Sequence, residues 1–94
     1  MDPTIKKQWL KALRSGQYEQ GRMALRTEAG TYCCLGVLVD ITQLQPLTGT
    51  GGCLLDSTRQ AVDLDIEDES IFVDANDDEG WTFEEIADYI EVML

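Results

Sequence analysis

Three arginines lie close together in the stretch LRSGQYEQGRMALR, residues 13–26, and they are the side chains best suited to bind a ligand. Arg14, Arg22 and Arg26 offer forked donors of the kind that recognise phosphate and carboxylate groups. The glycines between them let the backbone come close to a ligand. Neighbouring aromatic and amide side chains would stack on a base and bind its edges. We therefore interpret this region as a site for a small anionic, nucleotide-like ligand, with these candidate residues: Trp9, Arg14, Tyr18, Gln20, Arg22, Arg26, Tyr32 and Asn76.

The same arginines have a second interpretation, because the chain is strongly acidic. It carries 18 acidic and 7 basic side chains, which gives a net charge of −11. The arginines could therefore belong to a surface hairpin and pair with the protein's own carboxylates, an arrangement that is common and contributes little to stability. The charge is also unevenly distributed, with +2 over residues 1–50 and −13 over residues 51–94. Such asymmetry predicts two electrostatic faces or partners of opposite sign.

The acidic half suggests a different function. Nine acidic side chains fall within residues 63–79. Carboxylates at such a density could imitate the phosphates of DNA and block a DNA-binding protein, whose binding groove would be positively charged. Alternatively, the charge serves only to keep the protein in solution. The second functional hypothesis is therefore an acidic protein–protein inhibitor.

Residues 74–85, DANDDEGWTFEE, have the oxygen-bearing side chains of a calcium-binding loop at its first, third, fifth and twelfth positions. Such a loop requires glycine at its sixth position, where this chain has Glu79, and Gly80 comes one residue late. The pattern therefore favours an acidic turn that leads into a capped helix over a calcium site.

The adjacent Cys33 and Cys34 in TYCCLGVLVDI raise the question of thiol chemistry. A reactive thiol needs nearby cations or exposure, whereas the flanking residues here are apolar. Free cysteine is commonly buried and packs as a small hydrophobic residue, so we expect this pair in the core. The chain has three cysteines and no histidine, which leaves a structural zinc site short of ligands and removes the usual general base. We expect no enzymatic activity, no cofactor and no metal.

Apolar periodicity and capping residues predict the helices that must position these side chains. Asp2 and Pro3 suit the start of a helix that Gly16 ends. Thr82 and Glu85 form a capping-box pattern before the last apolar stripe. We expect four helices, over residues 3–15, 35–43, 56–64 and 83–94.

Two short apolar runs predict strands. Residues 23–26 and 31–35 flank a turn at residues 28–30 and would form a β-hairpin. Residues 71–73, Ile-Phe-Val, would add a short strand within the acidic segment. The expected fold class is therefore α+β, a small, mainly helical single domain over residues 1–94 with a short hairpin and one extra strand.

Chain length and hydropathy restrict the setting. With 94 residues, the chain can bury only one small core, so a homodimer would help its stability. No run approaches the roughly 18 apolar residues that span a bilayer, and the first residues lack the apolar region of a signal peptide. We expect a cytoplasmic protein that binds neither membranes nor nucleic acid directly.

Four segments together resemble a family of small bacteriophage-encoded proteins, most of them described only as hypothetical. The segments are WLKALRSGQYEQG (9–21), ALR (24–26), YCCLGVL (32–38) and the NDxEGxTFEEIADYI pattern (76–90). Family members often carry a further cysteine where this chain has Val39, and a longer middle in place of residues 43–55. The resemblance implies a phage accessory protein and supplies no catalytic residues.

Small phage proteins without enzymatic activity often counter host defences, either by binding a protein or by sequestering a nucleotide signal. That class implies counter-defence for this chain. Combined with the arginine-rich stretch, it makes sequestration of a nucleotide-like signalling molecule in the infected cell the leading hypothesis, and blockade of a basic host protein the alternative.

Overall fold

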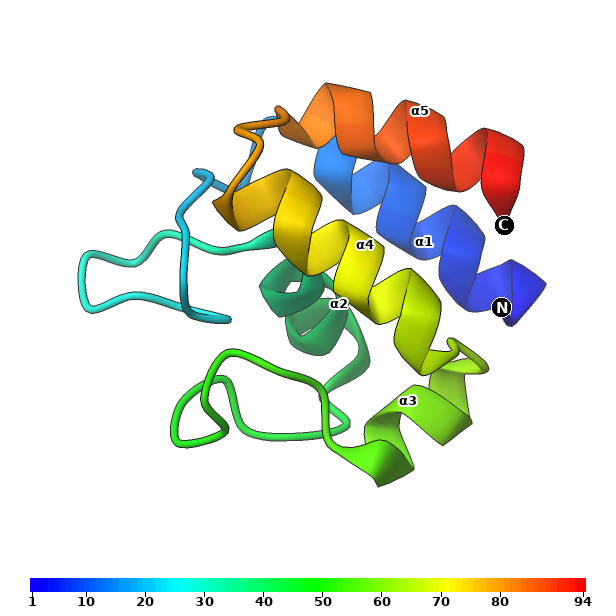
Figure 1. The fold of residues 1–94 in the computed structure, drawn as a ribbon, viewed down its shortest axis with the longest axis horizontal. Helices are drawn as coiled ribbons and strands as arrows, with labels where there is room; N and C mark the ends of the chain where they lie inside the picture. The colour runs from blue at the N-terminus through cyan, green and yellow to red at the C-terminus, as the bar shows by residue number, and fades with distance from the viewer.

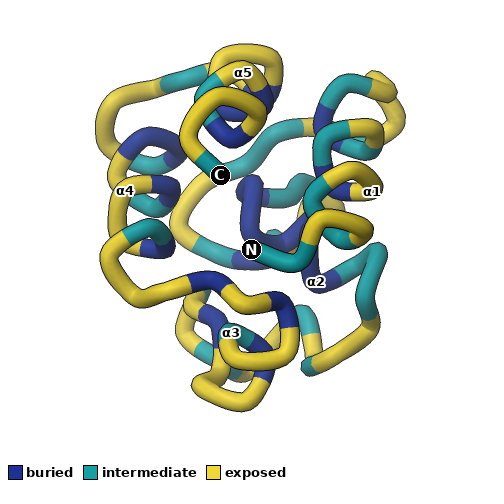
Figure 2. The backbone as a smooth tube through the Cα atoms, turned by 90° about the vertical axis from the view of Figure 1, so that its right-hand side faces the viewer, coloured by how far each residue is buried: buried dark blue, intermediate teal, exposed yellow.

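Five helices and their connecting loops form the fold, and the computed structural model describes all of residues 1–94 (Figure 1). The helices are α1 (Pro3–Arg14), α2 (Cys34–Thr42), α3 (Asp56–Val62), α4 (Ile66–Asp77) and α5 (Phe83–Met93). Helix α1 packs against α2 and α5, and α4 packs against the same two helices. In Figure 2, α1, α4 and α5 surround α2, while α3 closes one end.

The capping signals in the sequence are used as expected. The Asp2 carboxylate accepts a hydrogen bond from the Ile5 amide at 2.9 Å, and Pro3 begins α1. Thr82 and Glu85 form a complete capping box at the start of α5. The four helices predicted from the sequence are confirmed as α1, α2, α3 and α5, with ends that differ by one or two residues.

The predicted α+β class is wrong, because the structure contains no strand or sheet. The expected strand at residues 71–73 lies inside α4, a helix that the sequence analysis missed. Asp65 caps this helix by accepting from the Asp68 amide at 2.9 Å, and three acidic residues in the first turn favour the positive end of the helix dipole. The buried face of α4 includes Glu69 and Asn76, so its helical period was hidden by polar residues.

The predicted hairpin is also absent. Tyr32 forms two isolated bridges, one parallel with Gln20 and one antiparallel with Arg26. Met23 lies between them with a φ of +67°, in the left-handed region, which interrupts any extended run. Residues 15–33 therefore form a folded loop, called here the arginine loop, rather than a hairpin.

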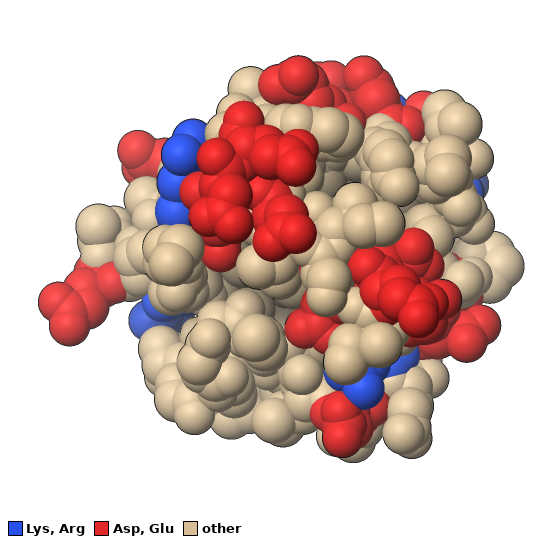
Figure 3. All heavy atoms as spheres, in the orientation of Figure 1, with Lys and Arg blue, Asp and Glu red and all other residues tan.

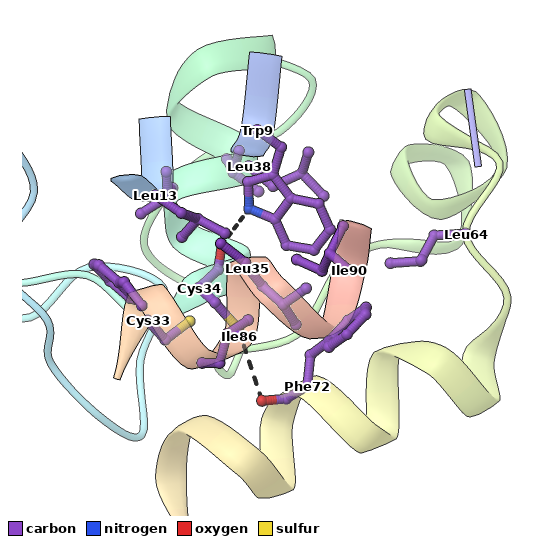
Figure 4. Close-up of a cluster of buried hydrophobic side chains, with 14 of the residues drawn as sticks. Trp9, Leu13, Cys33, Cys34, Leu35, Leu38, Leu64, Phe72, Ile86 and Ile90 are labelled. Carbon is purple, nitrogen blue, oxygen red and sulfur yellow. Dashed lines mark hydrogen bonds between the residues drawn. The ribbon is translucent and has the colours of Figure 1, made fainter. Parts of the chain in front are cut away.

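The core is centred on α2 and the residue that precedes it. Every residue from Cys33 to Val39 is buried, which confirms the expectation that the cysteine pair packs in the core. Cys33 caps α2 through its sulfur, which accepts from the Gly36 amide at 3.3 Å. Figure 4 shows Trp9 beside this segment, with its indole N–H donating to the Cys34 carbonyl at 3.0 Å.

Candidate functional site

Asn76 fixes the arginine loop to α4. Its side chain is buried, and its Nδ2 donates to the Gly21 carbonyl at 3.0 Å. Its Oδ1 accepts from Gln20 Nε2 at 2.9 Å and from the Cys34 amide at 3.3 Å. Gln20 Nε2 also donates to the Trp81 carbonyl at 2.7 Å. Both predicted ligand-binding amides are thus occupied by the protein's own groups, and they position the loop.

The two predicted loop tyrosines pack against each other. Tyr18 and Tyr32 meet edge to face with their ring centroids 5.0 Å apart. The Tyr18 hydroxyl donates to the Asp40 carboxylate. Partial burial raises the pKa of Tyr18 to about 12, and the hydrogen bond to Asp40 acts in the same direction. Both rings are half-buried, so they brace the base of the loop and leave no free stacking face between them.

Trp9, the other aromatic residue predicted to stack on a ligand, lies in the core. Its side chain is fully buried, and it meets Phe72 edge to face at a centroid distance of 5.5 Å. The structure therefore gives Trp9 a packing role and does not place it where a ligand could stack.

The four arginines fall into two pairs. Arg14 forms ion pairs with Asp88 at 2.8 Å and Glu91 at 2.9 Å, both on α5. These contacts raise its pKa, mainly through the hydrogen bond to Glu91. Arg59, on α3, pairs likewise with two carboxylates. Arg22 and Arg26 are exposed and form no ion pair. Of the eight predicted residues, only these two present free charge to solvent.

The structure also contains a surface groove that the sequence analysis did not identify. It has a volume of about 440 Å³ and runs along α5, lined by Trp81, Glu85, Asp88, Tyr89, Val92 and Met93. We call it the α5 groove. Val92 is 82% exposed and Met93 is 60% exposed, so two large apolar side chains of the groove face solvent. Trp81 and Tyr89 pack edge to face at 5.8 Å and form its aromatic wall.

A signal for this groove was present in the sequence. The buried stripe of α5 accounts for Phe83, Ile86, Ala87 and Ile90. Tyr89 and Val92 lie outside that stripe, one turn apart on a second apolar edge of the same helix. Apolar residues that lie outside the buried stripe of a helix are the pattern that would have indicated an external partner.

A second cavity, of about 360 Å³, lies between α4 and the loop that precedes α3. The Glu69 carboxylate lines it, but its oxygens accept from the Leu54 amide at 3.1 Å and from Arg59 at 3.3 Å. The Glu69 carboxylate therefore ties both α3 and the loop that precedes it to α4.

The residues of the calcium-like pattern do not surround a common centre. Residues 74–77 belong to α4, and the Glu85 carboxylate accepts from the Thr82 amide in the capping box. No group of three or more His, Cys, Asp or Glu side chains is arranged to hold a metal ion. The acidic turn that the sequence favoured is therefore shorter than expected, since residues 74–77 are helical and only residues 78–80 form a turn before the capped helix α5.

Acidic side chains outnumber basic ones by 18 to 7. Figure 3 shows Asp and Glu gathered in separate clusters on one face, where few Lys and Arg atoms are visible. The α5 groove includes two further carboxylates, those of Glu85 and Asp88. Together, fold and site define a small helical domain with one apolar groove edged by acids and one loop with two unpaired arginines.

Comparison with known proteins places part of the chain. Residues 1–46 match the family model of a domain of unknown function, DUF8296. The match includes α1, the arginine loop and α2, and it stops before Trp81 and α5, which form the groove. No curated protein and no solved structure matches the chain. None of the helices combines the length and apolar character required to cross a membrane.

Proposed function

We propose that this chain is a non-enzymatic binding protein that holds a basic, amphipathic segment of a partner protein in the α5 groove. The exposure of Val92 and Met93 beside two carboxylates is the observation that carries the proposal. An amphipathic segment would bury these apolar side chains and place its Lys or Arg residues near Glu85, which also serves the capping box, and near Asp88, which also pairs with Arg14 and keeps its side chain 70% exposed. The groove thus provides both a hydrophobic and an electrostatic contribution.

The charge distribution supports a basic partner. The segment that contains the groove belongs to the half of the chain with a net charge of −13. A field of that sign attracts basic proteins and accelerates their association, although it contributes less to final affinity. In the phage setting that the sequence resemblance implies, the partner would be a host protein, and its blockade would counter a host defence.

The proposal is tested with two synthetic amphipathic peptides of equal length, one of leucine and arginine and one of leucine and glutamate. We expect only the basic peptide to bind, with an affinity that falls as salt is added. Emission from Trp81 should change on binding, whereas Trp9 is shielded in the core. Equal binding of both peptides, or none of either, would contradict the proposal.

Two neighbouring glutamates provide a matched control. Glu85 lines the groove and Glu84 does not, although both lie in the first turn of α5. Glu85→Gln keeps a residue that is compatible with the capping box, so the helix start should survive. We expect Glu85→Gln to weaken the basic peptide several-fold more than Glu84→Gln does. Equal effects would mean that only the overall charge matters.

A second candidate function follows from the unpaired arginines. Arg22 and Arg26 have no carboxylate partner in a chain with 18 acidic side chains, which favours a nucleotide-like anionic ligand at the loop. Such a ligand at a hundredfold excess over its dissociation constant would stabilise the protein by about 2.7 kcal/mol. A thermal-shift screen of nucleotides and cyclic nucleotides tests this, with Arg26→Ala expected to abolish the shift. The absence of any shift would exclude this candidate.

A further inference from the structure

Met23 in the arginine loop has an unusual backbone conformation. Its φ of +67° is unfavourable for a residue with a side chain, and its side chain is 74% exposed. The Asp77 carboxylate accepts from the Met23 amide at 3.0 Å and helps to fix this conformation. The fold therefore maintains a strained backbone that presents a large apolar side chain to solvent, a combination typical of binding sites.

The surroundings of Met23 are the reverse of those in the α5 groove. The loop offers one exposed apolar side chain close in sequence to the two unpaired guanidinium groups of Arg22 and Arg26. The groove offers apolar and aromatic walls with the carboxylates of Glu85 and Asp88. The two surfaces of the same chain are thus opposite in charge, and both expose apolar side chains.

The loop and the groove are neighbours within one molecule. Gln20 binds the Trp81 carbonyl, and the Arg22 guanidinium lies against Gly80, where an added methyl group would be 3.2 Å from Nη2. Because Asn76 and Asp77 hold the loop in place, it lies beside its own groove and contributes no residue to its lining. A surface with complementary halves side by side can pair with a rotated copy of itself, so that both contacts form at once.

We propose that two copies of this chain form a twofold-symmetric dimer in which Arg22, Met23 and Arg26 of each protomer occupy the α5 groove of the other. This α5 groove is the same one that the proposed function assigns to a basic segment of a partner protein. The inference therefore rests on the proposed function, because it assumes that the groove binds basic and apolar side chains. The dimer covers the groove, and a basic partner must displace the loop to bind. Partner binding should therefore weaken as the concentration of the protein rises.

The test uses charge exchange across the proposed contact. The loop variant carries Arg22→Glu with Arg26→Glu, and the groove variant carries Val92→Lys with Met93→Lys, which leaves the capping box and the Arg14–Asp88 ion pair intact. Sedimentation of the wild-type protein should show a dimer that dissociates on dilution or at high salt. Each variant alone should dimerise at least tenfold more weakly, because like charges then face each other in both contacts. An equimolar mixture should regain the dimer, because opposite charges face each other again.

Three results would overturn the dimer: a wild-type protein that stays monomeric at millimolar concentration, single variants that dimerise as well as wild type, or folded variants that fail to dimerise when mixed. Circular dichroism of each variant shows whether it is folded. If either charge variant unfolds, the pair Met23→Ala and Val92→Ala replaces it, and each should weaken the dimer.

The loop variant also separates the two proposals, since its groove is intact. If it binds the leucine–arginine peptide as a monomer, the proposed function holds whatever the fate of the dimer.

Discussion

The arginine loop and the α5 groove differ in what their side chains bind. In the loop, the polar groups of Gln20 and Tyr18 form hydrogen bonds with other side chains of the protein. The buried Asn76 side chain donates a hydrogen bond to the backbone of the loop. In the groove, Val92 and Met93 face solvent and contribute little to the core. The loop is rich in residue types that bind ligands, yet most of them hold the fold together. The groove is apolar, and nothing within the chain occupies it.

The contrast between the arginine loop and the α5 groove shows that residue type alone is a weak guide to function. A buried backbone group must find a hydrogen-bond partner, and amide side chains at loop anchors supply one. An exposed apolar side chain on an otherwise well-packed helix has no such internal role. The comparison therefore predicts that substitutions under the loop reduce stability, whereas substitutions in the groove reduce binding.

The largest expected loss of stability comes from Gly36→Ala. A methyl group at Gly36 would overlap the carbonyl oxygen of Leu25, so the loop could no longer rest on α2. Backbone on both sides resists adjustment, and we expect a loss of about 3 kcal/mol or more. Urea unfolding measures it. Gly16→Ala is the control, because its methyl group meets open space and only the φ of +74° opposes it, at about 1 kcal/mol. Equal losses for the two would show that the loop does not press on α2.

Asn76→Ala should cost about 2 to 3 kcal/mol. The substitution leaves the Gly21 carbonyl and the Cys34 amide without their side-chain partner, and unsatisfied buried groups are expensive. The effect should be local, with faster hydrogen exchange at residues 19–23 and little change in α5. Uniformly faster exchange over the whole chain would indicate that Asn76 supports the core and not the loop in particular.

Cys33 is the last residue of the loop, and its thiol is buried. This burial predicts that the protein loses stability in alkali. Desolvation raises the pKa of this thiol from 9 to about 11, against the opposing hydrogen bond from Gly36. The unfolded thiol loses its proton at lower pH than the folded one, so stability is full below about pH 8.5 and declines between about pH 9 and 11. Two pKa units correspond to about 2 to 3 kcal/mol at the upper end of this range.

Cys33→Ser isolates this contribution, because serine does not titrate and can still cap α2. Urea unfolding across this pH range should therefore show a shallower decline for the variant than for the wild type. A residual decline is expected from Cys34, whose burial also raises its pKa, and from Tyr18 above pH 10. Identical pH profiles for variant and wild type would contradict the assignment.

Local signals predicted α1 and α5 because each has a side-chain cap and an apolar stripe that act within a few residues, and α2 because it is a continuous apolar run. Helix α3 was also predicted, although no side chain caps it. Helix α4 was missed because its buried face includes Asn76 and Glu69, whose reasons for burial lie elsewhere in the chain. The Glu69 carboxylate accepts a hydrogen bond from the Leu54 amide, and the Asn76 side chain donates one to the Gly21 carbonyl in the arginine loop. Such long-range partners leave no trace in a window of single-sequence periodicity.

The candidate site was predictable only in part, for the same reason. The exposure of Arg22 and Arg26 and the ion pairs of Arg14 depend on which acids α5 brings near α1, and spacing along the chain does not encode that. Trp9 could have been assigned to the core, since it falls on the apolar stripe of its helix. The groove was predictable from Val92 and Tyr89, which are apolar but lie outside the buried stripe of α5.

The smallest expected effect on stability is that of Val92→Ala, and it is the sharpest test of the comparison. Val92 is 82% exposed and Val37 is fully buried, so the same change of two methyl groups can be made in the groove and in the core. Val37→Ala should lose about 2 kcal/mol through the cavity it leaves. Val92→Ala should stay within about 0.5 kcal/mol of the wild type.

Binding of the leucine–arginine peptide should show the opposite order. Under conditions in which both variants are folded, Val37→Ala should bind as the wild type does, whereas Val92→Ala should bind several-fold more weakly because it removes apolar surface from the groove. Unfolding curves and peptide titrations on the same two samples therefore separate the two roles. If Val92→Ala reduced stability as much as Val37→Ala, the groove would be part of the core, and the contrast between an inward-facing loop and an outward-facing groove would not hold.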